Sequence, residues 1–206
     1  MKTLAGCALV ALAITVETAA QVTRGSWELS LSATMGSVSS STEYTYGGKT
    51  STYEGEAETY LSLAIRPGFF VVDGLSIEPE LLWTAIEGDQ PAIAVLGGLS
   101  YTFTIPESPV APFILVGYGI GNGIPIAQRL IGRTSSDFDV SALNAGGGLK
   151  VFVSPNVAFR AEYRYQRYSW QEEVTFSWNP EYLSKFERVT AYHNIFIGIS
   201  VFFPSK

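Results

Sequence analysis

Residues 157–165, VAFRAEYRY, place apolar or aromatic side chains at every second position and small or charged side chains between them. Residues 194–203, NIFIGISVFF, show a similar alternation at the end of the chain. Because successive side chains of a β-strand point to opposite faces, each segment would have one oily face and one face of mostly small, polar or charged residues. This arrangement is typical of a strand that separates lipid from a filled barrel interior.

Eight segments of this kind follow one another, without a convincing helical period between them. We expect strands at about 26–35, 57–70, 75–86, 92–104, 110–120, up to 153, 157–168 and up to 203. The links after the second, fourth and sixth strands are tight, as at Val72-Asp73-Gly74. The polar links at 36–56, 122–136 and 171–185 are long, whereas the short link at 87–90 departs from this alternation. The pattern predicts an all-β, eight-stranded antiparallel up-and-down transmembrane β-barrel with both termini on the periplasmic side.

The polar faces of these strands carry charges of both signs, interleaved with glycines. The charged residues are Glu28, Arg66, Glu78, Glu80, Lys150, Arg160, Glu162 and Arg164, and the glycines are Gly98, Gly117, Gly119, Gly146, Gly148 and Gly198. Small residues suit a lumen so narrow that side chains fill it. Aromatic residues near the ends of the oily faces, such as Trp27 and Trp83, match interfacial girdles. We therefore predict that the charged residues form a network that plugs the lumen.

The N-terminus has the composition of a secretory signal peptide. Lys2 precedes an apolar core at Leu4–Val16, and small residues end the segment before Gln21. We expect a signal peptide at residues 1–20 and a single outer-membrane β-barrel domain at 21–206. Cys7 is the only cysteine, so the mature chain would have neither a disulfide framework nor a thiolate metal site. The net charge of −6 and the lack of a basic patch argue against nucleic acid.

Catalysis has little support in the sequence. His193 is the only histidine, it falls on the oily face of the last strand, and no serine follows two residues later. Glu78 and Glu80 lie two residues apart and could serve acid–base chemistry, but partners for them are available in the arginines of the same face. We predict no enzyme activity, no catalytic residue, no cofactor and no metal site.

The segments AEYRYQRY (161–168) and HNIFIGISVFF (193–203), with the signal peptide and eight strands, resemble the small OmpA/OmpX-type outer-membrane β-barrel family. The resemblance implies an outer-membrane location, contact with membrane lipid and lipopolysaccharide, and recognition of a C-terminal aromatic residue by the barrel-assembly machinery. Phe203 is the corresponding assembly signal. Two departures are Pro204-Ser205-Lys206 after that residue and Phe196 at a position that is usually polar.

Three functions remain open at this point. The first is a structural barrel whose external loops meet a partner, in particular the loop 36–56 with its many Ser, Thr and Tyr residues. The second is a narrow porin-like passage for solutes. The third is a secreted lipocalin-like ligand carrier, because Gly25-Ser26-Trp27 fits the start of that fold, although no helix is expected after the last strand.

Overall fold

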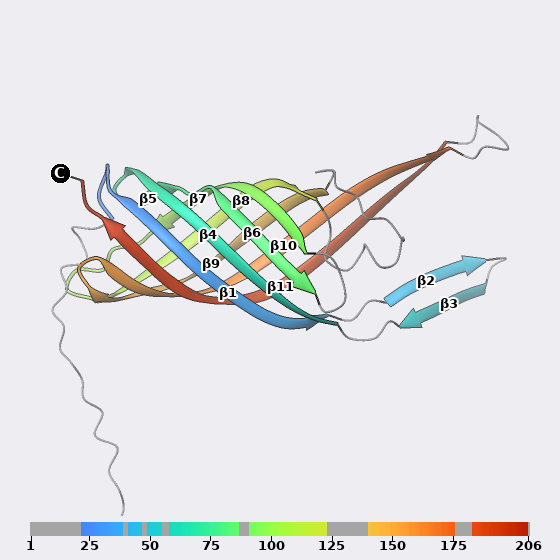
Figure 1. The fold of residues 1–206 in the computed structure, drawn as a ribbon, viewed down its shortest axis with the longest axis horizontal. Coiled ribbons are helices and arrows are strands. Elements are labelled where there is room, and N and C mark those ends of the chain that lie inside the picture. Colours follow the sequence, from blue (N-terminus) through green and yellow to red (C-terminus); the bar gives the residue numbers. More distant parts are fainter. Residues whose placement is uncertain are drawn as a thin grey trace, which may run out of the picture.

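The computed structural model describes residues 22–38, 41–46, 49–54, 58–86, 91–122, 140–175 and 183–205. The main sheet closes on itself, because β1 pairs with both β4 and β11 and every pairing is antiparallel (Figure 1). The wall strands are β1 (Trp27–Val38), β4 (Glu58–Val72), β5 (Leu75–Ile77), β6 (Glu80–Ile86), β7 (Ala92–Thr102), β8 (Val110–Gly121), β9 (Val140–Ser154), β10 (Val157–Thr175) and β11 (Leu183–Phe203). β5 and β6 together occupy one place in the wall, so the prediction of an eight-stranded barrel is confirmed.

The predicted strand 75–86 is interrupted at its middle. Glu78 and Pro79 belong to neither β5 nor β6, although the Glu78 N–H still donates to the Gly98 carbonyl at 2.8 Å. Proline has no N–H to donate to a ladder, which explains the break at Pro79. The two halves keep the same neighbours, β4 and β7, so the wall continues across the interruption.

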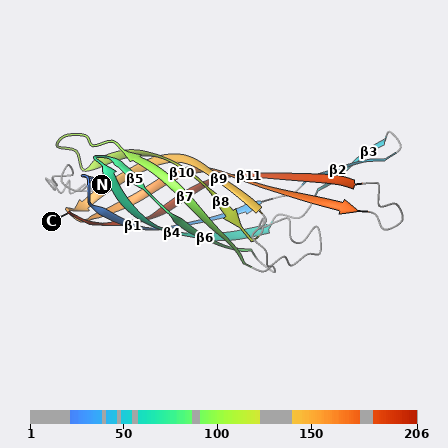
Figure 2. The ribbon, with the colours of Figure 1, turned by 90° about the horizontal axis from the view of Figure 1, so that it is seen from above.

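Two of the predicted polar loops contain strands. Within 36–56, β2 (Ser41–Tyr46) and β3 (Lys49–Glu54) form a separate two-stranded sheet. The prediction of a loop at 171–185 is wrong, because β10 and β11 stay paired as far as Thr175 and Leu183 and extend beyond the barrel wall (Figures 1 and 2). Apolar alternation cannot mark strands outside the membrane, where neither face meets lipid. Most of the predicted link 122–136, and all of 87–90, lie outside the described residues.

The start of β1 and the end of β11 lie at one end of the barrel, together with tight turns at 73–74, 106–107 and 155–156 (Figure 2). Gly74 has a φ of 80°, a backbone conformation that favours glycine in a tight turn. The β2–β3 hairpin and the extensions of β10 and β11 lie at the opposite end. Short links at one end and projecting segments at the other agree with the predicted alternation.

A short segment before β1, Val22–Ser26, lies beside the end of β4 and the turn that follows it; we call it the N-terminal strap. Its Val22 carbonyl accepts from the Gly74 N–H at 2.8 Å, and its Gly25 N–H donates to the Phe70 carbonyl at 2.8 Å. The Val22 side chain is buried among apolar residues of the lumen. The strap therefore narrows the lumen at this end.

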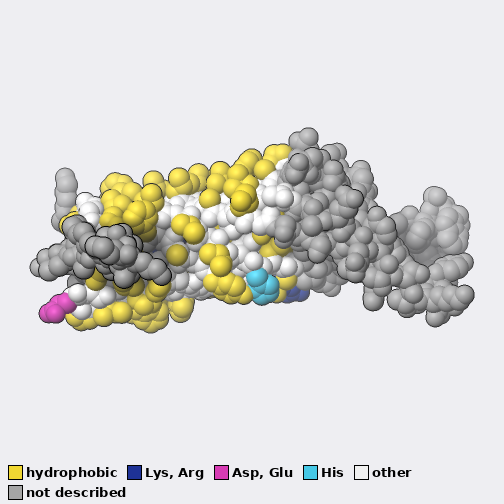
Figure 3. Space-filling model, turned by 90° about the horizontal axis from the view of Figure 1, so that it is seen from below, with side chains coloured by type: hydrophobic (Ala, Val, Ile, Leu, Met, Phe, Trp, Pro, Cys, Tyr) yellow, Lys and Arg dark blue, Asp and Glu magenta, His cyan; other side chains and the backbone are white. Residues whose placement is uncertain are grey.

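The outer surface is a belt of apolar side chains (Figure 3). Ile195 and Ile197 are both 67% exposed, whereas Asn194 and Phe196 between them are buried. No helix in the described part of the chain is long and apolar enough to cross a membrane. An apolar exterior around a charged interior is the reverse of a soluble barrel, and it excludes the lipocalin-like alternative, in which the oily faces would line the inside.

Candidate functional site: the charged lumen

All eight charged residues singled out in the sequence point into the lumen and are at most 6% exposed. They come from five places in the wall: Glu28 on β1, Arg66 on β4, Glu78 and Glu80 around the break between β5 and β6, Lys150 on β9, and Arg160, Glu162 and Arg164 on β10. The seven that belong to strands lie on the inward face by the period of two, and Glu78 lies in the break between β5 and β6. The fold thus brings together residues that are up to 136 positions apart, as the numbers of Glu28 and Arg164 show.

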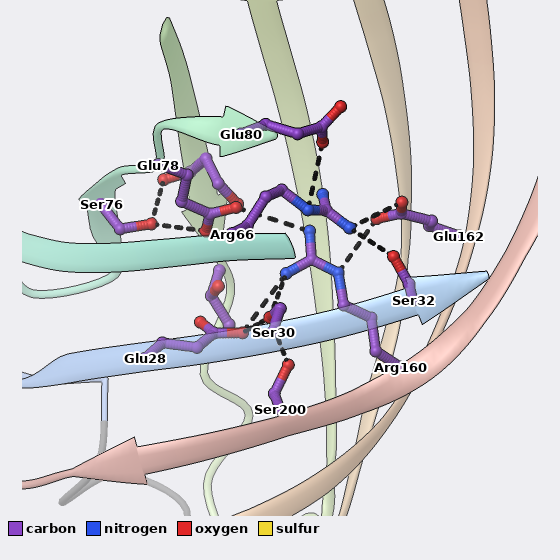
Figure 4. Close-up of polar contacts among 12 residues, drawn as sticks. Glu28, Ser30, Ser32, Arg66, Ser76, Glu78, Glu80, Arg160, Glu162 and Ser200 are labelled. Atoms are coloured by element: carbon purple, nitrogen blue, oxygen red, sulfur yellow. Dashed lines mark hydrogen bonds and ion pairs between the residues drawn. The ribbon is translucent and has the colours of Figure 1, made fainter. Parts of the chain in front are cut away.

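Glu162 is the centre of the cluster. Its Oε1 lies 2.8 Å from Arg66 Nη2, its Oε2 lies 3.0 Å from Arg160 Nε, and it also pairs with Arg164 Nη2. Figure 4 shows the Arg66 and Arg160 side chains converging on this carboxylate from different strands. One carboxylate therefore holds three guanidinium groups together.

The remaining ion pairs join all eight residues into one network. Glu28 pairs with Lys150 at 2.6 Å and with Arg160 at 3.3 Å. Glu80 pairs with Arg66 at 3.2 Å and with Arg164 at 2.9 Å, and Glu78 lies 3.6 Å from Arg160. Four carboxylates face four cations, so the formal charges cancel. This balance matters because ions taken out of water need partners to offset the lost hydration.

Neutral polar side chains, which were not among the predicted site residues, extend the network. On one side, Lys150 donates to Thr102 at 3.2 Å, and Arg160 donates to Ser30 at 3.2 Å. On the other side, Asn144 donates to Glu80 at 3.1 Å. From Asn144 the chain of hydrogen bonds continues through Gln166 and Asn194 to Tyr60. The sequence feature that could have identified these residues is their position on the polar, inward face of each strand.

Two aromatic layers enclose the charges. Towards the termini the lumen is filled by Val22, Phe70, Ala111, Phe152, Ala158 and Phe202, and towards the projecting segments by Ala64, Leu82, Ala94, Leu96, Val140, Ala142, Tyr168, Tyr192 and Phe196. The Lys150 ammonium lies 5.3 Å from the ring centroid of Phe113, and the Arg164 guanidinium lies 4.0 Å from that of Phe196. Cations over ring faces are favourable contacts. The aromatic side chain at 196, which departs from the usual pattern, therefore packs on a member of the network.

Glycines lie directly across the sheet from several of the charged residues. Gly148 pairs with Glu162, Gly146 with Arg164, and Gly198 with Arg160. A Cβ atom built on Gly148 would lie 2.0 Å from the Ala161 carbonyl oxygen, far inside van der Waals contact. The glycines therefore have a second role besides leaving space in a narrow lumen. They allow the backbones of neighbouring strands to lie close together at the positions where the long charged side chains point inward. We call these residues the glycine–charge pairs.

A small cavity of about 20 Å³ adjoins the network. Its lining includes Arg66, Glu78, Glu80 and Asn144. Arg66 Nη1 makes no hydrogen bond to any described residue. A cavity of this size has room for about one water molecule, and apolar residues such as Leu96 line it together with the polar ones.

The two other sequence-predicted positions lie on the outer surface. His193 faces outward, and its Nδ1 is hydrogen-bonded to the Tyr163 hydroxyl. Phe203 is 52% exposed and pairs with Trp27 at the seam where β11 meets β1. Among the described residues no group of three or more His, Cys, Asp or Glu side chains could hold a metal ion.

Comparisons with known proteins agree with this geometry. The family model described as "Outer membrane protein beta-barrel domain" matches residues 6–181. The structure is similar to the Neisserial surface protein A, with a TM-score of 0.51 and 15% identity over 86% of this chain and 96% of the other. It is also similar to the outer membrane protein OprG from Pseudomonas aeruginosa, with a TM-score of 0.52 and 14% identity over 90% of this chain and 99% of the other. No curated protein matches the chain.

Proposed function

The chain belongs to the outer membrane protein β-barrel domain family, and from this premise we propose that it is a structural barrel whose filled lumen passes no solute and whose external segments carry its interactions. The observation that supports this proposal most is the closed ionic network between two aromatic layers. Eight strands leave room for side chains but not for an aqueous channel, for which general porins use about sixteen.

The network also serves as a lock between distant strands. Arg66 on β4 and Glu162 on β10 are not sheet neighbours, yet their side chains meet at 2.8 Å across the lumen. Opening a path would separate such pairs, and an unpaired buried charge costs several kcal/mol. The lumen is therefore expected to stay shut under ordinary thermal motion.

A narrow porin-like passage is the second candidate, and the cavity beside Arg66 is the observation in its favour. At about 20 Å³ it is sized for a single water molecule rather than for a solute. Passage would require both aromatic layers and the ion pairs between them to move apart. We therefore place this function second.

Conductance separates the two candidates. The purified barrel is first shown to be folded, because a closed barrel migrates differently on a detergent gel before and after boiling. It is then inserted into planar bilayers and, in parallel, into liposomes for sugar-driven swelling, with a general porin as positive control. We expect only baseline current and no swelling. Large and stable conductance of the folded protein would refute the closed-lumen proposal.

External interaction is assigned to the segment 36–56. Its hairpin, β2–β3, pairs with no strand of the barrel sheet, which makes it an accessory to the wall rather than a part of it. Removing residues 41–54 should leave heat-dependent gel migration unchanged while abolishing binding to an extracellular partner, measured as adhesion of bacteria displaying the barrel. A deletion of residues 176–182, which connect β10 to β11 in the sequence, serves as control. Unchanged adhesion after removal of 41–54 would overturn this assignment.

The route to the membrane follows from the same proposal. Export through a cleaved signal peptide predicts that Edman sequencing of the mature protein starts at Gln21. Membrane lipid, lipopolysaccharide and the barrel-assembly machinery are the expected partners during and after insertion. We propose no enzymatic role, since His193 faces lipid and is bonded to a tyrosine rather than to a nucleophile–carboxylate pair.

A further inference from the structure

The outer surface of the barrel is not the same at its two ends. His193 lies ten residues before Phe203 on β11. At about 3.3 Å per residue and a strand tilt of about 40°, this corresponds to roughly 25 Å along the barrel axis, the height of the apolar band of such barrels. His193 thus lies at the edge of the belt furthest from the termini, where Figure 3 shows the histidine in cyan beside a basic side chain.

Charge is distributed unevenly between these two edges. Among the residues whose side chains the structure describes, Arg167 is the one lysine or arginine on the outward face of the barrel wall. Arg24 belongs to the N-terminal strap at the opposite end, where the exposed carboxylates Asp73 and Glu107 also lie. The described edge near the projecting segments therefore combines a cation with hydrogen-bond donors, without an exposed carboxylate.

Arg167 and His193 are neighbours on that edge. In the β10–β11 register Arg167 pairs with Ala191 and Tyr165 pairs with His193, so Arg167 and His193 are diagonal neighbours on one face. The imidazole ring lies between two tyrosines, with centroid distances of 5.9 Å to Tyr163 and 5.3 Å to Tyr165. The Tyr163 hydroxyl occupies Nδ1, which leaves Nε2 without a partner among the described residues.

These features suit a phosphorylated sugar at a membrane surface. A guanidinium binds a phosphate through two parallel hydrogen bonds, and an imidazole N–H adds a third donor. Exposed tyrosine rings offer flat apolar faces for the sugar to which the phosphate is attached, and aromatic residues are typical of this depth. The aliphatic residues below, such as Ile195, would contact the acyl chains of the same molecule.

We propose that Arg167, His193, Tyr163 and Tyr165 form a binding site for the phosphorylated glycolipid headgroup of the outer leaflet. The site commits to one source of phosphate, a lipid A-type headgroup of lipopolysaccharide, because it lies at the rim of a lipid-covered surface and not in the lumen. The proposal rests on the orientation given above, with the projecting segments outside the cell, but not on a closed lumen.

Native mass spectrometry of the intact folded protein in detergent tests the proposal. The probes are lipid A with both phosphates, the same glycolipid with its phosphates removed, and inorganic phosphate. The variants are Arg167→Gln and His193→Phe, with Arg24→Gln as the control that removes an exposed arginine at the other edge. Each variant is first checked for heat-dependent gel migration, so that only folded barrels are compared.

We expect Arg167→Gln to bind phosphorylated lipid A at least about tenfold more weakly than the wild-type protein, which is the effect of losing a charge-assisted hydrogen bond. His193→Phe should weaken binding to a smaller extent, and Arg24→Gln should bind as the wild type does. Equal binding of the dephosphorylated glycolipid, or no effect of Arg167→Gln, would overturn the site. Displacement of lipid A by an equal concentration of inorganic phosphate would assign the site to free phosphate instead. A conducting lumen would refute the proposed function and leave these results standing.

Discussion

Neutralising Glu162 is the sharpest test of the lumen network. In Glu162→Gln the shape of the side chain is kept, but Arg66, Arg160 and Arg164 lose the carboxylate that they share. The network then holds three carboxylates and four cations, so one positive charge remains without compensation. The substituted position is 2% exposed, and water cannot reach it to replace the lost charge.

The size of the effect follows from the three ion pairs. Each pair of unit charges about 4 Å apart is worth about 4 kcal/mol at an effective dielectric constant of about 20. Much of that sum is offset for two reasons. Burying a neutral amide does not carry the desolvation penalty of several kcal/mol that burying a carboxylate carries, and the amide oxygen still accepts hydrogen bonds. The net loss in the free energy of unfolding should be about 3–5 kcal/mol, as for other buried ion pairs that lose one partner.

Urea unfolding of the barrel refolded in lipid vesicles measures this loss, with unboiled gel migration as the readout of the folded fraction. Glu107→Gln is the matched control, since Glu107 is an exposed carboxylate in a turn, and its stability should change by less than about 0.5 kcal/mol. In the double variant Glu162→Gln/Arg164→Met, three carboxylates again face three cations, and Glu80, the other partner of Arg164, keeps its ion pair with Arg66, so a large part of the stability should return. A loss below about 1 kcal/mol in Glu162→Gln, or no recovery in the double variant, would refute the network as the lock of this barrel.

Two further substitutions test the wall and the seam. Gly148→Ala should destabilise the folded barrel by about 1–3 kcal/mol in the same urea assay, because its Cβ would lie 2.0 Å from a backbone oxygen. Gly97→Ala is the control, since the nearest atom to a Cβ at Gly97 would be 4.0 Å away. An equal loss of stability in both variants would contradict the reasoning. Phe203→Ala should slow assembly into membranes by the barrel-assembly machinery at least severalfold while leaving refolding in detergent unchanged, measured by pulse-labelling and gel migration. The neighbouring Phe202→Ala should slow refolding in detergent, since that ring is buried in the lumen, and should leave recognition by the assembly machinery unchanged. Slowed refolding in both variants would remove the basis for an assembly signal at Phe203.

Much of the architecture was predictable because a membrane imposes a strict period of two on every strand. Counting in twos from Arg160 places Glu162 and Arg164 in the lumen without any structure. The same count from Arg66 reaches Phe70, and from Lys150 it reaches Phe152, and both of these apolar side chains are buried in the lumen. A lumen has a middle and two ends, and only the middle of this one is polar. Alternation along a strand does not reveal this distinction.

The partners within the network could not be predicted. Arg66 meets Glu162 across the lumen rather than along the sheet, and which carboxylate it reaches depends on strand tilt and on stagger around the barrel. The extension of β10 to Thr175 was missed for a different reason. Outside the membrane neither face of a strand has to be apolar, so backbone pairing leaves no pattern in the side chains.

The glycine–charge pairs have a consequence for how such a gene can change over generations. A side chain at Gly148 would push the wall apart near Glu162, and a neutral residue at Glu162 would leave three arginines without their shared carboxylate, so both changes destabilise the barrel. Few substitutions should therefore be tolerated at either position, whereas an outward isoleucine can become valine or leucine at little cost, because fluid lipid has no shape to match. In this barrel the residues that accept least change should thus be the small ones that face charged residues across a strand, rather than those of the apolar belt.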